Sequence, residues 1–321
     1  MYDTYLWKIK PLSSFMTPWQ SDTIYGHLLW GAKLIYGDDE VEKIIKAFKE
    51  EKAPFIVSNG FLGGQLPIIK KDLIKRSYTE EFSKIYGENI VETVKKLKEI
   101  NKIKNVSIDM FNKLRGDYSN KNYIEDLLKS STKSNELNGK KHSNISAVIH
   151  NNINRLTGTT VDNGIFSLKE SFVDNNIYIF IKVNKSFEIG KMKKLLKFME
   201  DNGFGKKVSV GKGAFKEVSF EKFNDFKKIQ GANSFVVLSN YVPKEGDYSK
   251  VISENHLIKR GKIGNIEGEV SFPFKKPFSC FGPGSVFKKG KNEKYGKVLN
   301  NIHYNNKIVQ IGIPFTLEVK I

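Results

Sequence analysis

The residues whose types and spacing most clearly suggest chemistry form a glycine-rich segment, Gly203-Phe204-Gly205-Lys206-Lys207-Val208-Ser209-Val210-Gly211-Lys212-Gly213. The segment is not a nucleotide-hydrolysing P-loop, because five residues instead of four separate Gly205 from Gly211 and Gly213 follows Lys212. It follows an expected helix and precedes an expected strand, whereas a dinucleotide-binding fingerprint follows a strand and opens a helix. Three lysines, a hydroxyl and bare backbone N–H groups suit the phosphates of a nucleic acid. A glycine-rich turn with solvated lysines is the alternative.

Two further segments carry polar side chains. The first, Phe15 to Trp30, leads into an expected helix, whose N-terminus favours an anion, although Ser21 or Asp22 would equally serve as an ordinary cap. The second, His150 to Thr159, could hold an RNA backbone and the edges of unstacked bases, or form an ordinary turn. The candidate RNA-binding residues of these segments are Thr17, Trp19, Gln20, Ser21, Asp22, His150, Asn151, Asn154 and Arg155.

Catalytic and metal-binding constellations are weak in this sequence. The five histidines are scattered without the spacing of a metal-binding pair, and no Gly-x-Ser-x-Gly elbow is present. Cys280 is the single cysteine, which excludes a multi-cysteine zinc site and an internal disulfide. We expect no cofactor, no metal and no catalytic residue. The alternative is metal-independent RNA cleavage, for which His142 and His150 are the available general bases.

The charge balance favours a polyanionic partner. The 321 residues include 53 Lys and Arg against 35 Asp and Glu, a formal charge of +18, and each phosphate that such a surface neutralises releases counterions. Lysine, asparagine and isoleucine are abundant, so an A/T-rich genome could supply part of the excess, and the chain would then bind only other proteins. No stretch of about 18 apolar residues could span a bilayer, and the first thirty residues form no signal-peptide core. We therefore expect a cytoplasmic protein with no membrane partner.

Strands and helices alternate along the first two thirds of the chain. The alternation of Tyr2 to Lys10 and the apolar run of Ile177 to Val183 predict strands, and Asp162-Asn163-Gly164 predicts the turn of a hairpin. Residues 67–150 predict a mostly helical insertion with a flexible basic end at 129–141. Further helices are expected from Ser21 and at 41–52 and 188–202, and further strands at 55–58, 155–161, 165–172 and 214–220.

In chain order these elements give strand, helix, strands, helix, strand, which is the split βαβ order of a ferredoxin-like fold. We therefore expect an α+β protein. Its first domain, residues 1–225, would be ferredoxin-like, with the helical insertion (about 67–150) between the inner strands and the glycine-rich loop at 203–213. Residues 230–321 are rich in turns and predict a second, β-rich domain.

Three motifs in one order resemble the RAMP proteins of CRISPR effector complexes. Residues 17–30 are similar to that family's Ser-Asp-Thr-hydrophobic-x-Gly segment, Asn154 to Gly158 to its Arg-x-Thr/Gly segment, and 203–213 to its glycine-rich loop. The resemblance covers nearly the whole chain, and it is strongest to the type III-A (Csm) subunit that caps the complex at the 5′ end of the CRISPR RNA (crRNA). Further matches are Leu238 to Pro243, Lys276 to Phe278 and Gly284 to Val286.

The resemblance implies two ferredoxin-like (RRM-type) domains, recognition of the repeat-derived 5′ handle of the crRNA, and no cleavage activity. It also implies two protein partners, the large Palm-domain signature subunit of the Csm complex and the repeating backbone RAMP subunit. A RAMP-type endonuclease that processes repeat RNA is the alternative within the superfamily. By position, the residues implied near handle phosphates are Gly205, Lys206, Lys207, Ser209, Gly211, Lys212 and Gly213, with Thr17 to Asp22 and His150 to Arg155 along the same RNA path.

Overall fold

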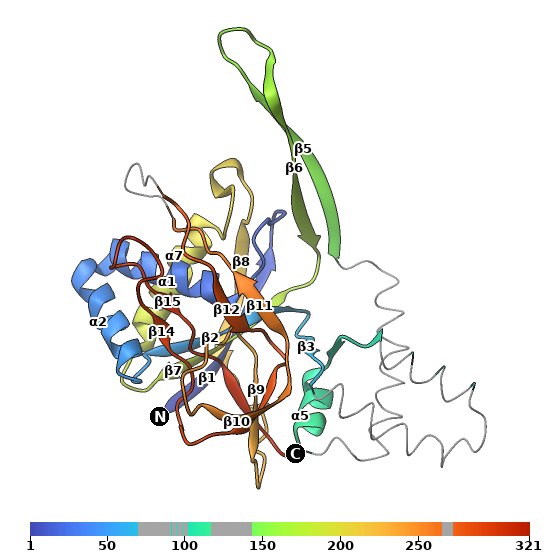
Figure 1. Ribbon diagram of the computed structural model, residues 1–321, viewed down its shortest axis with the longest axis vertical. Coiled ribbons are helices and arrows are strands. Elements are labelled where there is room, and N and C mark those ends of the chain that lie inside the picture. Colours follow the sequence, from blue (N-terminus) through green and yellow to red (C-terminus); the bar gives the residue numbers. More distant parts are fainter. Residues whose placement is uncertain (70–90, 92–94, 96–97, 99–101, 117–142, 265–271) are drawn as a thin grey trace.

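The computed structural model (Figure 1) describes residues 1–69, 91, 95, 98, 102–116, 143–264 and 272–321. Most of the predicted helical insertion, including its basic end at 129–141 and His142, lies outside the described residues. Within the described part of that insertion, β3 (Leu66–Pro67) pairs with β4 (Asn105–Val106) and is followed by the helix α5 (Ile108–Gly116).

The first sheet contains four antiparallel strands in the order β2-β7-β1-β8. Side chains of alternating strand residues point to opposite faces, and Trp7, Ile9, Ile179 and Ile181 point to one face, where all four are fully buried. The strands are β1 (Tyr2–Pro11), β2 (Phe55–Leu62), β7 (Ile177–Asn184) and β8 (Phe215–Lys222).

Three helices cover that face of the first sheet (Figure 1). They are α1 (Ser21–Tyr36), α2 (Asp38–Lys49) and α7 (Ile189–Asn202). Leu28 of α1 and Leu195 of α7 are among the buried residues of this core, as the helical spacing of apolar residues predicts. Strands and helices of this unit follow one another in the β-α-β-β-α-β pattern, with α1 and α2 in the first crossover and α7 in the second.

The second sheet repeats the relative strand order of the first, β10-β13-β9-β16, again antiparallel. Its connections contain the short ladders β11 (His256–Lys259) with β12 (Phe278–Phe281) and β14 (Val298–Leu299) with β15 (Gln310–Ile311). No helix occurs in the described residues after 222. The mixed α+β class is confirmed, whereas two ferredoxin-like domains stay a prediction. The sheet's strands are β9 (Ser234–Val237), β10 (Tyr248–Ser253), β13 (Val286–Lys289) and β16 (Thr316–Val319).

The second sheet packs on the face of the first sheet that the helices leave free. Phe180 of β7 belongs to one buried cluster with Val236 of β9 and with Phe315. Phe223 and Phe226, in the connection between the sheets, also contact the Phe180 ring, with centroids 5.0 and 4.8 Å away. The two predicted domains therefore share a hydrophobic core, and a boundary between 225 and 230 stays a prediction.

A long hairpin projects from the body (Figure 1) and consists of β5 (Ser143–Ile153) and β6 (Thr160–Val173). Its turn lies between these strands at 154–159, so the prediction of a turn at Asp162-Asn163-Gly164 is wrong. Asn163 does have a positive φ of 57°, but it lies within β6, where the strand pairing shifts opposite Asn151 and Ile153. Asn-Gly is suited to left-handed backbone in a bulge as well as in a turn.

Candidate nucleic-acid interface

The glycine-rich loop (residues 203–213) is fixed against the loop that precedes α1. The backbone N–H of Gly213 donates to the Ser14 carbonyl at 2.8 Å, and that of Lys206 donates to Thr17 Oγ1 at 3.0 Å. These bonds join parts of the chain that are almost 200 residues apart. The glycine-rich loop and the segment around Thr17 are therefore brought together, as the RNA-binding prediction requires.

Two of the glycines are required by close contacts. A Cβ on Gly205 would lie 2.4 Å from the Thr17 Cβ, and one on Gly213 would lie 2.0 Å from the Phe204 carbonyl oxygen. Gly211 has a positive φ of 81° but no atom within 4 Å of such a Cβ. Gly205 and Gly213 thus fix the ends of the loop, while Gly211 supplies only a left-handed turn after the 3-10 turn η1 (Val208–Val210).

The exposed part of the loop is 206–211. It presents the side chains of Lys206, Lys207 and Ser209 to solvent, together with Val210, which is 65% exposed. Lys207 has a positive φ of 64°, and the 3-10 turn follows it at once. The loop therefore offers two cations, one hydroxyl and an irregular backbone at the surface, a combination that can contact phosphate groups.

Lys212 is oriented differently from the other two lysines of the loop. Its Nζ donates to Glu170 Oε2 at 2.7 Å and to Ser14 Oγ at 3.0 Å. The Glu170 side chain belongs to β6 and is 1% exposed. Hydrogen bonds from Lys212 and Ser14 lower the pKa of the Glu170 carboxyl. Lys212 is thus an internal contact between the glycine-rich loop and the hairpin.

Trp19 is a core residue, 5% exposed. Its indole stacks on the Phe204 ring of the glycine-rich loop, with centroids 3.8 Å apart and an interplanar angle of 9°. It also meets Trp7 and Phe215 edge to face. Trp19, one of the predicted site residues, therefore packs against the buried Phe204 of the loop and offers no exposed ring for stacking on a base.

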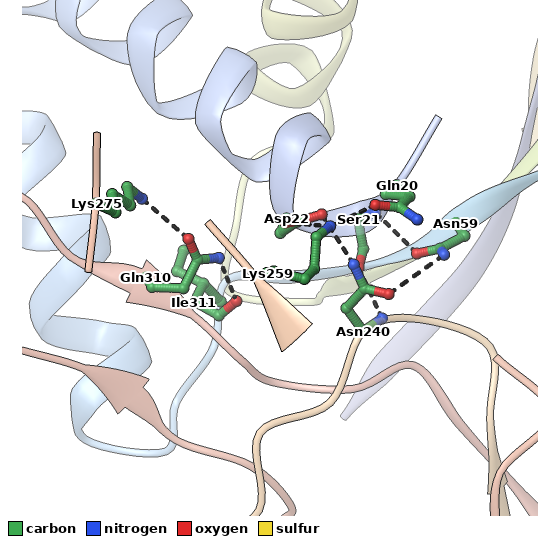
Figure 2. A network of polar contacts seen from close by, with 9 residues as sticks. All are labelled: Gln20, Ser21, Asp22, Asn59, Asn240, Lys259, Lys275, Gln310 and Ile311. Carbon is green, nitrogen blue, oxygen red and sulfur yellow. Dashed lines mark hydrogen bonds and ion pairs between the residues drawn. The ribbon is translucent and has the colours of Figure 1, made fainter. Parts of the chain in front are cut away.

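Ser21 and Asp22 bond to Asn240, which follows β9, and to residues of β2 and β11 (Figure 2). The Asn240 backbone N–H donates to Ser21 Oγ at 2.9 Å, and the Asn240 side chain donates to Asp22 Oδ1 at 2.9 Å. The Ser21 backbone N–H donates to Asn59 Oδ1 at 2.8 Å, and Lys259 Nζ lies 2.5 Å from Asp22 Oδ2. Gln20 is the N-cap of α1 and its side chain makes no capping hydrogen bond, so ordinary capping by Ser21 or Asp22 is also wrong.

The same network continues into the connections of the second sheet. Gln20 accepts a hydrogen bond from Lys259 through its Oε1. Figure 2 also shows Lys275, whose Nζ donates to Gln310 Oε1 at 3.0 Å, while Gln310 Nε2 donates to the Ile311 carbonyl at 3.2 Å. Burial lowers the pKa of Lys275 to about 8. Three predicted site residues, 20 to 22, therefore bond to the segment after β9 and to β11, both of which connect strands of the second sheet.

The remaining predicted residues lie on the hairpin. His150 stacks on Phe166, with centroids 5.4 Å apart, and Asn151 donates to Thr160 Oγ1 at 3.2 Å across the strands. Asn154 shapes the turn, because its Oδ1 accepts the Leu156 N–H at 2.9 Å. Arg155 is exposed beside it at the tip. Asn151 and Arg155 are exposed near the tip, whereas His150 is half-buried and its Nε2 is buried without a hydrogen-bond partner among the described residues.

His27 is a loop-positioning residue that sequence reasoning missed. Its Nε2 accepts the Gly205 N–H at 3.2 Å, and its ring lies against Phe204, with centroids 4.9 Å apart. Burial lowers the pKa of His27 to about 4, so the ring is neutral and able to accept at neutral pH. His27 lies about one and a half turns into an expected helix, and nothing in the sequence around it indicates a contact with residue 205.

The described residues also bear on the expectations for a metal site, a reactive cysteine and a membrane-spanning helix. No three His, Cys, Asp or Glu side chains there lie close enough together to hold a metal ion. Cys280 is buried in β12, and burial raises the pKa of its thiol to about 11. None of the described helices is both long and apolar enough to cross a lipid bilayer.

Comparison with solved structures shows the same fold over the whole chain. One similar structure is a Csm1-Csm4 cassette in complex with pppApA, with 14% identity, a TM-score of 0.60, and coverage of 100% of this chain and 99% of the other. Another is a Csm3-Csm4 subcomplex of the type III-A CRISPR-Cas interference complex, with 19% identity, a TM-score of 0.63, and coverage of 100% of both chains. No curated protein matches the sequence.

The comparison with protein families also bears on the glycine-rich loop. The model of the RAMP superfamily matches residues 20–216, more than half of the chain. The matched span begins just before α1 and ends just after the glycine-rich loop, so it contains the loop and His27, whereas Ser14, Thr17 and Trp19 precede it. The chain belongs to the RAMP superfamily.

Proposed function

We propose that this protein is the RNA-binding subunit of a type III-A (Csm) CRISPR effector complex that holds the repeat-derived 5′ handle of the crRNA. The observation that carries the proposal is the exposed segment 206–211, which presents Lys206 and Lys207 on a backbone fixed by Thr17 and His27. A fixed loop of this kind binds phosphates without the entropic cost of ordering it. Membership of the RAMP superfamily and the likeness to subunits of Csm complexes support the assignment.

Phosphate contacts, not stacking, would dominate the binding of the handle. Among the described aromatic side chains near the loop, Trp19 and Phe204 are buried, and the loop itself exposes only lysines, Ser209 and valines. The handle would bind as splayed single-stranded nucleotides, because an A-form helix offers little sequence readout to side chains. The RNA would continue toward the hairpin, whose tip carries Arg155 and Asn151.

The proposed subunit has two protein neighbours and no cleavage activity of its own. The similar structures pair Csm4 with Csm1 in one case and with Csm3 in the other. By analogy, this chain would contact the large Palm-domain subunit on one side and the backbone RAMP subunit on the other, in the cytoplasm. We also infer that its second sheet is a reduced ferredoxin-like unit, since it has the strand order of the first sheet with loops in place of helices.

The test is a salt series of binding isotherms with two single-stranded RNAs, one bearing the 5′ handle and one with that end scrambled. The double variant K206E/K207E is compared with K193E/K194E, which makes the same charge change at exposed positions of α7. We expect handle affinity to fall at least about tenfold in the first variant only. The slope of log affinity against log salt should also decrease by about 0.7 for each phosphate that the variant no longer neutralises.

Equal losses in the two variants, or equal binding of the two RNAs by the unmodified protein, would reduce the loop to a generic basic surface. The RNA is examined for cleavage in the same samples. Cleavage of repeat RNA that disappears in His142→Ala or His150→Ala would establish the endonuclease alternative instead.

A further inference from the structure

Glu170 lies where the glycine-rich loop, the loop before α1 and the root of the hairpin meet. Its Oε2 accepts hydrogen bonds from Ser14 Oγ and Lys212 Nζ, both at 2.7 Å. One residue along, Ser171 exchanges two backbone hydrogen bonds with Phe15, at 2.9 and 3.0 Å. Each of the three segments is therefore bonded to the others within a few ångströms of this carboxylate.

The Glu170 carboxylate is buried, although a charged side chain is normally exposed to solvent. Glu170 is 1% exposed, and its second oxygen, Oε1, has no hydrogen-bond partner among the described residues. Removing one member of a buried ion pair strongly destabilises a protein, because it leaves the other charge buried without a partner. Removing both members can leave the stability nearly unchanged. Lys212 is thus the cation that allows a carboxylate at this position, and a phosphate that attracted Lys212 would leave Glu170 unpaired.

We propose that Glu170 is a positioning residue that, through Lys212 and Ser14, locks the glycine-rich loop to the root of the hairpin, so that the two segments meet RNA as one rigid surface. Lys212 then serves this internal contact and does not touch the RNA, in contrast to Lys206 and Lys207. The inference rests on the proposed function for the identity of the ligand. The contact itself is independent of that function.

The test compares K212M, E170M and the double variant E170M/K212M by the affinity for the handle RNA and its salt slope. An internal contact predicts that K212M weakens handle binding about tenfold or more, because the buried carboxylate displaces the loop. The double variant, which removes both charges, should then bind within about threefold of the unmodified protein with an unchanged salt slope. If Lys212 touches a phosphate, the double variant stays as weak as K212M and its slope falls by about 0.7, which would overturn the proposal.

Hydrogen exchange separates failure of this proposal from failure of the proposed function. The amide of Lys206, bonded to Thr17, and the amide of Ser171, bonded to Phe15, report on the loop and on the hairpin root. Both should exchange faster in K212M and regain protection in E170M/K212M, whatever RNA the protein binds. Faster exchange at Lys206 alone, or at neither amide, would overturn the lock even if handle binding is confirmed.

The thermal unfolding midpoint shows whether each variant folds. If K212M does not fold, K212Q takes its place, because its amide can still donate to Glu170. The lock predicts a salt slope close to that of the unmodified protein in K212Q, because Lys212 neutralises no phosphate, and a handle affinity higher than that of K212M where both variants fold. A slope reduced by about 0.7 in that variant would again mean that the charge of Lys212 meets a phosphate.

Discussion

At the scale of single residues, the imidazole of His27 accepts a hydrogen bond from one end of the glycine-rich loop. His27 accepts the Gly205 N–H only while Nε2 carries no proton. Its pKa in the folded protein is about 4, below the value of about 6.5 that is usual for an exposed histidine. Between these two values the unfolded chain binds a proton that the folded protein does not, so stability must rise with pH in that window.

We therefore predict that the contribution of His27 to the unfolding free energy is fully present above about pH 6.5. This contribution should fall by about 1 to 2 kcal/mol between pH 7 and pH 5. His27→Gln keeps an acceptor for Gly205 without titrating. The measurement is chemical unfolding of both proteins from pH 7 to pH 5, and the difference between the two curves isolates His27. Parallel curves would show that the imidazole does not hold the loop.

At the scale of elements, a largely buried ion pair joins the N-terminus of α1 to β11, which lies in a connection of the second sheet. Asp22 and Lys259 are 2.5 Å apart, with side chains only 9% and 17% exposed, and Asn240 also donates to Asp22. Loss of one partner of such a pair leaves an uncompensated buried charge. The pair therefore holds α1 and β11 in a fixed relative position.

Asp22→Ala should destabilise the protein by about 3 kcal/mol. The matched control is Asp201→Ala, which removes the partner of Lys197 in a pair on α7 that is 2.8 Å long and more than half exposed on both sides. An exposed pair contributes about 0 to 1 kcal/mol. Urea unfolding of both variants measures the difference, and similar losses would contradict the structural role assigned to Asp22.

The elements with strong local patterns were predictable from the sequence. Apolar stripes and alternation located α1, α7, β1 and β7, because burial of one face leaves a periodic trace in the chain. The hairpin was expected, but its turn was misplaced, since an Asn-Gly pair marks positive φ and does not distinguish a turn from a bulge.

The candidate site was predictable only in part, because its contacts are long-range. The loop at 206–211 is exposed as its lysines and glycines indicated. By contrast, Trp19, Ser21 and Asp22 have polar or aromatic side chains typical of an RNA contact but are used for internal packing and bonding. Glu170 and His27 gave no signal, since their partners lie 42 and 178 residues away in the chain.

At the scale of the whole molecule, the two sheets share one buried hydrophobic cluster, so we predict that they unfold together. Phe180 is fully buried between them, and its ring lies near those of Phe223, Phe226 and Phe315. Phe180→Ala should cost about 3 to 5 kcal/mol and should lower the midpoint of a single transition. The control is Phe172→Ala on the hairpin, where the ring is 46% exposed and the cost should stay within about 0.5 kcal/mol.

Tryptophan fluorescence and far-UV circular dichroism measure these transitions, and the two methods report on different parts of the protein. Trp7 and Trp19 both belong to the helix-covered core, whereas circular dichroism also reports the second sheet. Coincident transitions in Phe180→Ala would confirm one cooperative unit. Separate transitions would instead support two independent domains divided between 225 and 230.

The position of β1 in the middle of the first sheet, between β7 and β8, has a consequence for biosynthesis. Strand β1 ends at Pro11, but β8 begins only at Phe215. At roughly 5 to 20 residues per second, a ribosome needs about 10 to 40 s to make the intervening chain. Throughout that interval the nascent β1 lacks a complete pair of neighbours, and its Trp7 and Ile9 side chains lack the full core that later buries them. Assembly of the sheet is therefore a late event, and slow translation or a shortage of chaperones should reduce the yield of folded protein more than it would for a fold whose first strands pair with each other.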